Sequence, residues 1–150
     1  MIPAQNNKYV IVTSPAAIVD AGSYTTNAID TAGFDYLTVL VAVGFLDIAM
    51  TVLKLQTSDT NGSYGDLTGA VFGTSTNIDG ATSTLPAADD DNKLFAIEVD
   101  LRGKKRWFDL VATMGDGSTG GFIAAVAILS KGENIGNTAA AYGCDEILRV

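Results

Sequence analysis

Short apolar runs, separated by polar and glycine-containing segments, follow one another along most of the chain. Val, Ile, Leu, Phe and Thr dominate these runs, which is the composition of β-strands. Residues 138–148 are expected to form a short helix or an extended arm, and no other segment suggests helical periodicity. The runs that we expect to form strands are residues 9–13, 34–43, 48–57, 67–72, 95–101, 107–114 and 122–129.

Two of these runs alternate between apolar and polar positions. Side chains point to opposite faces of a strand at successive residues, so alternation indicates one buried and one open face. In residues 95–101 the open face carries Glu98 and Asp100, and in residues 107–114 it carries Asp109 and Thr113. The inward sets are predicted to be Phe95, Ile97, Val99 and Leu101 in the first run and Phe108, Leu110, Ala112 and Met114 in the second.

Two other runs do not alternate. Residues 34–43 are almost continuously apolar, as expected for a strand that is covered on both faces. In residues 122–129 both alternate sets are apolar. We expect this strand to be central in its sheet or to be covered by a neighbouring subunit.

The connections favour antiparallel pairing, because parallel strands need long crossovers that the sequence does not offer. Residues 102–105 and 115–121 are short, glycine-containing segments that predict hairpin turns. The predicted fold is therefore all-β: an antiparallel β-sandwich or jelly roll in one domain over residues 1–150. It would carry long polar loops within residues 58–92, an N-terminal arm over about 1–8 and a small-residue C-terminal tail over about 131–150.

Charge and hydropathy narrow the range of partners. The 150 residues include 9 basic and 17 acidic residues, and the net charge of −8 disfavours nucleic-acid binding because it repels phosphate backbones. The longest apolar stretch, residues 37–50, is interrupted by Gly44 and Asp47 and is shorter than the ~20 residues of a membrane-spanning helix. The first residues do not have the pattern of a secretory signal, so we expect a protein that stays in the cytoplasm where it is made, or in an assembly built there.

The residue types needed for most active sites are missing. The sequence has no histidine, which removes Ser-His-Asp and Cys-His arrangements and the common zinc sites. Residues 59–63 resemble the start of a calcium loop, but Ala70 stands where such a loop needs a glutamate. Residues 89–91 form an acidic turn before a strand, and the single Cys144 has no nearby candidate base. We expect neither an enzyme nor a resident metal or cofactor.

What remains is a set of candidate contact residues. A basic cluster lies between two predicted strands, and the single tryptophan follows it directly. Both have a simpler interpretation, as a solvated turn and as a packed ring. The C-terminal tail adds a few apolar anchors among small residues. The candidate interaction surface consists of Trp107, Arg102, Lys104, Lys105, Arg106, Tyr142, Ile147 and Leu148.

The order of the predicted strands and their residue sequences resemble those of a known group of proteins. The segments that carry the resemblance are TAGFDYLTVLVAVGFLDIAMTVLKLQTSD, LPAADDDNKLFAIEVDLRGKKRWFDLVAT and GDGSTGGFIAAVAILSKGE, between residues 31 and 133. They resemble small head and structural proteins of tailed bacteriophages, in particular capsid cement or decoration proteins. The resemblance implies a homo-oligomer, a dimer or a trimer, that binds the major capsid protein on the outer surface of the virion and clamps neighbouring capsomers.

An alternative stays open from the sequence alone. An exposed tryptophan on a sheet is a common platform for a sugar ring, and Asp109 and Thr113 share its predicted face. The same fold hosts many binding functions. The alternative is therefore a carbohydrate- or receptor-binding β-sandwich module of a phage fibre or baseplate.

Overall fold

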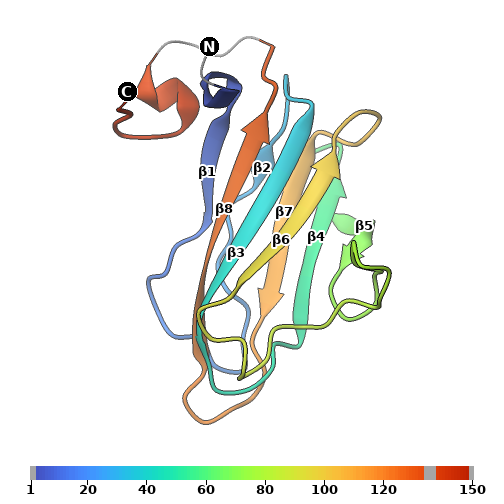
Figure 1. Cartoon of the computed structure of the whole chain (residues 1–150), viewed down its shortest axis with the longest axis vertical. Coiled ribbons are helices and arrows are strands. Elements are labelled where there is room, and N and C mark those ends of the chain that lie inside the picture. Colours follow the sequence, from blue (N-terminus) through green and yellow to red (C-terminus); the bar gives the residue numbers. More distant parts are fainter. Residues whose placement is uncertain (1–2, 134–137, 149–150) are drawn as a thin grey trace.

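The computed structural model describes residues 3–133 and 138–148 of the chain. Its eight strands form two four-stranded antiparallel sheets that pack face to face (Figure 1). In chain order the elements are the 3₁₀ helix η1 (Pro3–Asn6), β1 (Lys8–Thr13), β2 (Ile29–Asp30), β3 (Tyr36–Leu46), β4 (Val52–Ser58), β5 (Gly65–Val71), β6 (Leu94–Asp100), β7 (Trp107–Thr113), β8 (Gly121–Ser130) and the 3₁₀ helix η2 (Ala139–Tyr142). The prediction of an all-β sandwich is confirmed.

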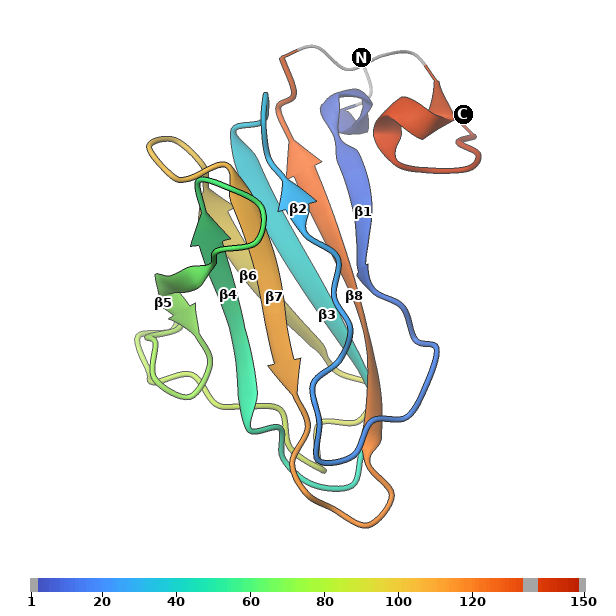
Figure 2. The same cartoon turned by 180° about the vertical axis from the view of Figure 1, so that it is seen from behind.

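The strand order identifies the topology as a jelly roll. Sheet A has the order β1-β8-β3-β6, and sheet B, seen from behind in Figure 2, has the order β2-β7-β4-β5. Strand β1 pairs with β8, β2 with β7, β3 with β6 and β4 with β5. The chain is thus one long hairpin rolled into two sheets, which is the jelly-roll arrangement.

Two expected hairpins are wrong. Strands β6 and β7 lie in different sheets, and so do β7 and β8, so residues 102–106 and 114–120 connect one sheet to the other. The strands that are adjacent in sequence and also paired are β4 and β5. A glycine-containing turn reverses the chain equally well within a sheet and between two packed sheets, so the turn residues do not distinguish the two cases.

The core lies between the sheets and is built from one apolar set of each long strand. Strict alternation in β6 and β7 predicts the inward side chains correctly: Phe108 and Leu110 are at most 1% exposed, and Ile97 and Val99 are 8% exposed. The β3 and β8 sets of sheet A lie beside the β6 set and face the β7 set of sheet B. They are Leu37, Val39, Val41 and Val43 on β3 and Ile123, Ala125, Ala127 and Leu129 on β8.

The expectation that residues 34–43 are covered on both faces is wrong for the described chain. Strand β3 is central in sheet A, and its inner set is buried, but Ala42 on its outer face is exposed. Strand β8 is also central, between β1 and β3, as expected. The outer halves of Phe122 and Val126 on β8 nevertheless reach solvent, each with 37% of its surface exposed.

The long polar region contains one strand, as predicted. Residues 59–64 connect β4 to β5, and residues 72–93 return from β5 in sheet B to β6 in sheet A. Asp90 organises the end of this return: its Oδ2 accepts the Ala87 N–H at 2.9 Å, and Lys93 Nζ lies 2.8 Å from its Oδ1. The acidic run 89–91 thus forms the turn that opens β6.

Candidate interaction surfaces

Most of the candidate contact residues lie at one end of the sandwich, which we call the basic end. It consists of the β6–β7 turn (residues 101–106) with Trp107, the 3₁₀ helices η1 and η2, and Lys131 after β8. Strands β6 and β8 end there and β1, β3 and β7 begin there, so both described chain ends and the β6–β7 turn share this end (Figure 1). The topology brings the basic cluster and the C-terminal anchors to the same end of the molecule, on opposite sides of it.

Two arginines of the turn are held by aspartates. Arg106 makes a bidentate pair with Asp30 on β2, with Nε–Oδ1 and Nη2–Oδ2 distances of 2.7 Å. This hydrogen bonding is the main reason why the pKa of Asp30 is lowered. Arg102 Nε donates to Asp100 Oδ1 at 2.9 Å, and Arg102 holds the pKa of Asp100 at about 2. The two guanidinium groups are therefore fixed in place while more than half of each side chain stays exposed.

The lysines of the turn are less constrained. Lys105 Nζ lies 3.4 Å from Asp59 Oδ2, and both side chains are largely exposed. Lys104 is exposed and forms no ion pair with a described residue. On the sheet A side, Arg102 and Lys131 approach the Tyr36 ring at 5.8 and 5.2 Å from its centroid. Basic side chains thus lie beside both sheets at the basic end.

Trp107 begins β7 and faces outward, as the alternation predicts. Its ring is half-buried, and the Arg106 guanidinium lies 5.2 Å from the ring centroid. That guanidinium is fixed by Asp30. A sugar ring stacked on this face would have to displace a held cation, so the geometry of Trp107 does not favour the carbohydrate-binding alternative.

The C-terminal segment packs against the edge strand β1. The Thr138 side chain accepts the Ala141 N–H at the start of η2, and Gly143 ends the helix in the left-handed conformation at φ 77°. Tyr142 is only 5% exposed, so its ring contacts this chain rather than forming open surface. Ile147 is half-buried, whereas Leu148 is 91% exposed. Of the three predicted anchors, Leu148 is the one that is open for a partner.

The outer face of sheet A is a second candidate surface, and the candidate residue set did not include it. Its outward side chains are mostly apolar, and no described segment crosses their centre (Figure 1). The charged outward residues of the four strands are Glu98 and Asp100, near one end of β6. We define the apolar face as eight of the other outward residues: Ile11, Leu40, Ala42, Leu94, Ala96, Phe122, Ala124 and Val126.

The outer face of sheet B is polar by comparison. Lys54 on β4 forms an ion pair with Asp66 on β5 at 2.7 Å, and Gln56 donates to the same carboxylate at 2.7 Å. Thr26 donates to Asp109 on β7 at 2.9 Å. Polar groups that hydrogen-bond to one another across the strands are typical of a surface that contacts water. The outer face of sheet B is therefore polar, whereas the outer face of sheet A is mostly apolar.

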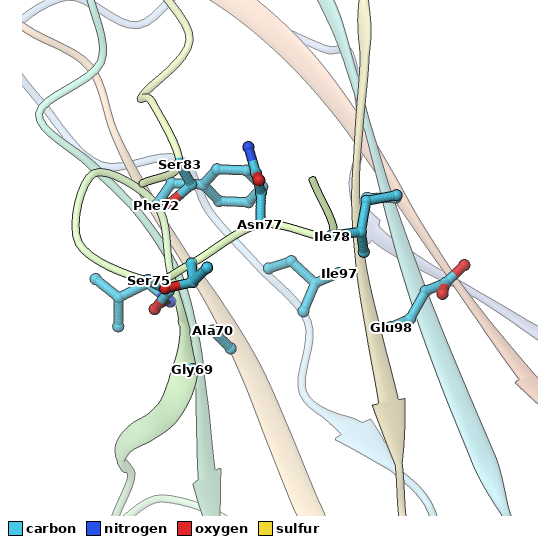
Figure 3. A pocket seen from close by; sticks show the side chains of 12 residues that line it. Gly69, Ala70, Phe72, Ser75, Asn77, Ile78, Ser83, Ile97 and Glu98 are labelled. Atoms are coloured by element: carbon cyan, nitrogen blue, oxygen red, sulfur yellow. Dashed lines mark hydrogen bonds between the residues drawn. The ribbon is translucent and has the colours of Figure 1, made fainter. Parts of the chain in front are cut away.

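A cavity of about 500 Å³ opens between the edge strands β5 and β6 (Figure 3). Phe72, Ile78 and Ile97 give it an apolar lining, and the β5–β6 loop forms one wall. The loop's polar side chains are used to hold its own backbone: Ser75 Oγ accepts the Val71 N–H at 3.0 Å, and Asn77 Oδ1 accepts the Ala81 N–H at 3.0 Å. The length of the polar loop was a signal that this region differs from a plain sandwich.

Opposite the basic end, an aspartate organises the β7–β8 connection. Asp47 Oδ2 accepts the backbone N–H groups of Ser118, Thr119 and Gly120 at 2.7, 2.6 and 2.9 Å. These hydrogen bonds lower the pKa of Asp47. Within residues 3–133 and 138–148 no group of three or more potential metal ligands comes together. The glycine-rich segment is thus a connection folded around a carboxylate.

No helix in the described part of the chain has the length and apolar character needed to cross a membrane.

Comparisons with known proteins do not assign the chain to a family. Neither the models of known protein families nor the curated proteins contain a match. Among solved structures, the chain is similar to the SPBc2 prophage-derived protein YomS, with a TM-score of 0.45 and 18% identity over 82% of this chain and 93% of that one. A TM-score of this size carries no argument about fold or function, so the fold assignment rests on the strand order above.

Proposed function

We propose that the chain is a structural protein of a tailed-bacteriophage particle, and specifically a capsid cement protein. It would bind the outer surface of the head through the major capsid protein and stabilise the contacts between capsomers. The proposal rests on the resemblance of residues 31–133 to such proteins and on a jelly-roll framework whose candidate chemistry lies on its surfaces.

The observation that carries the proposal is the gathering of contact residues at the basic end. The chain is acidic overall, with a net charge of −8, yet the β6–β7 turn places four basic residues on one exposed connection. Leu148 adds an exposed apolar side chain on the other side of that end. An end that combines cations with an apolar side chain suits a partner that offers carboxylates around an apolar depression.

A charge-reversal pair tests the basic end. Heads of the phage that encodes this chain would be purified from a strain that lacks its gene. They would be mixed with the wild type, with a Lys104→Glu, Lys105→Glu variant, or with a Ser14→Glu, Ala17→Glu control in the exposed connection after β1, at the opposite end. We expect the wild type and the control to sediment with heads and raise their heat stability, and the double variant to bind at least about tenfold more weakly.

Electron microscopy of the native particle supplies the decisive outcome. Density for this chain on the outer surface of the shell, at contacts between capsomers, is the expected result. Density on the tail or fibre would contradict the cement role, and so would an intact virion that lacks the chain.

The alternative of a carbohydrate-binding module makes a different prediction. Trp107 is the single tryptophan, so its fluorescence reports directly on a ligand that stacks there. Because Arg106 already lies over the ring, we expect no shift on titration with host-surface glycans. A saturable shift that is lost in Trp107→Phe would favour the alternative.

A further inference from the structure

We infer that the apolar face of sheet A binds the same face of a second copy of this chain, forming a two-fold symmetric dimer. The inference concerns the purified protein and does not depend on the proposed function. Its evidence is the chemistry, the relief and the size of the face.

The chemistry of the face is unusual for an uncovered surface. Ile11 and Leu94 are 59% and 62% exposed, and Phe122 and Val126 are each 37% exposed, all on the same side of one sheet. Monomeric proteins rarely leave large contiguous apolar patches open to water. A partner for this patch must itself be flat, apolar and free of charge, and this face is such a surface.

The relief of the face is complementary to itself. One row across the strands, aligned by the pairing register, consists of Ile11, Val126, Leu40 and Ala96, of which the first three are large. The adjacent row begins with two alanines, Ala124 and Ala42, and ends at Leu94. The first row is a ridge and the alanines form a trough beside it.

A two-fold axis that runs across the strands, between these rows, places the ridge of each copy over the trough of the other. Such an interface is isologous, with the same patch on both subunits. Two sheets packed in this way lie about 10 Å apart, as the two sheets inside each sandwich do.

A glycine lets the surface lie closer to the backbone at the end of the apolar face that is away from the basic end. Gly44 lies on the outer side of β3, and a Cβ atom there would come within 2.4 Å of the Phe122 ring. The ring therefore lies over the Gly44 backbone instead of standing out from β8. Glu98 and Lys131 flank the face towards the basic end and Lys93 precedes Leu94 at the opposite end, so the patch has an apolar centre with charges at its edges.

The size of the face sets the expected strength. At about 4.8 Å between strands and about 6.8 Å between outward rows, each outward position covers about 33 Å², so the eight members of the apolar face cover roughly 260 Å² and all outward positions of the four strands roughly 500 Å². Two copies that overlap over the whole outer surface of sheet A would bury about 1,000 Å² in total, the lower limit for a specific interface, and the apolar face supplies about half of that area. We therefore expect a reversible dimer with a dissociation constant in the micromolar range.

The test compares the same substitution on the two sheets. Val126→Glu places a carboxylate at the centre of the face, on the central strand β8, and the control Val111→Glu places one on the outer face of sheet B, on the central strand β7. Both valines point outward, so neither change enters the core. Sedimentation velocity from about 1 to 200 μM would give the masses.

We expect the wild type and Val111→Glu to approach twice the chain mass of 15.5 kDa, and Val126→Glu to remain at 15.5 kDa. An unpaired buried carboxylate should weaken association at least about a hundredfold. Ala42→Glu, which adds a carboxylate at an exposed alanine without removing packed atoms, should act in the same way. Circular dichroism and thermal melts would show that each variant is folded.

Three results would overturn the inference: a wild type that is monomeric over the whole range, a trimer, or a Val126→Glu variant that associates like Val111→Glu. The outcome is separable from that of the proposed function. A wild-type monomer whose binding to heads is abolished by Val126→Glu would assign the face to the shell instead of to a second copy, whereas a dimer that does not bind heads would leave the inference intact and refute the cement role.

Discussion

The docking of the C-terminal segment on β1 depends on one glycine. Gly143 has a φ of 77°, and a Cβ atom at this position would lie 1.8 Å from the backbone carbonyl oxygen of Tyr9. No side-chain rearrangement relieves a contact with backbone at that distance. Gly143→Ala should therefore release η2 from β1. Gly33→Ala is the matched control, because Gly33 has a φ of 83° but no atom within 4 Å of the place that an added methyl group would take.

The expected magnitudes differ in origin. In Gly33→Ala, alanine must adopt the left-handed conformation, which costs about 1 kcal/mol. In Gly143→Ala, the released segment is free to relax, so the loss equals the free energy with which the segment docks. Burial of the Tyr142 ring contributes about 2 kcal/mol to that term. At about 3 °C per kcal/mol for a domain of this length, Tm should fall by about 3 °C in the control and by about 6 °C in Gly143→Ala.

Cys144 gives a sharper assay than Tm. It is the single cysteine of the chain, it is half-buried next to Gly143, and its thiol lies 3.8 Å from the Tyr142 carbonyl oxygen. Its rate of reaction with a thiol reagent under native conditions should rise about tenfold or more in Gly143→Ala and stay at the wild-type rate in Gly33→Ala. Equal thiol rates in the two variants would refute the docking argument, whatever the Tm values.

Two further predictions concern the core and the acid limit of stability. Phe108 is fully buried between the sheets, so Phe108→Ala should cost about 3–5 kcal/mol in urea unfolding, and a cost below about 1 kcal/mol would contradict its central position. Because the pKa of Asp100 is lowered to about 2 by Arg102, the stabilisation from this pair is complete above the usual value of 3.8 and is lost as the pH falls through about 2. Asp100→Asn should therefore make Tm depend less steeply on pH between about 4 and 2, a small effect for an exposed pair, and an unchanged slope would argue against the pair.

The sequence predicted the inner layer of the fold well because alternation has a direct physical cause. In β6 and β7 the outward positions carry Glu98, Asp100, Asp109 and Thr113, which leaves one apolar set to be buried. The pairing partners of the strands were not predictable in the same way. Whether a turn such as residues 102–106 closes a hairpin or passes to the opposite sheet depends on the packing of both sheets, which no local pattern records.

The candidate surfaces were likewise predictable only where a local sequence pattern marks them. Residues 102–107 were predictable as a contact candidate because charge and aromaticity cluster in the sequence itself. Their location at the same end as the C-terminal segment was not, because it arises when β6, β8, η1 and η2 meet at one end. The cavity beside Phe72 and Ile97 joins two edge strands whose closeness is likewise a result of the roll.

The non-alternating strands carry information beyond the fold. A jelly roll needs one apolar set from each strand, and on β4 and β7 in sheet B the outward positions include the polar residues Lys54, Gln56, Asp109 and Thr113. Strands β3 and β8 carry a second apolar set that the core does not use, in a chain whose net charge of −8 otherwise favours solvation. An apolar residue on the water side of a sheet stabilises the folded monomer less than a buried one does, and it promotes association. In the dimer inferred above, this second set is buried between the two copies, and the comparison of Val126→Glu with Val111→Glu tests that assignment.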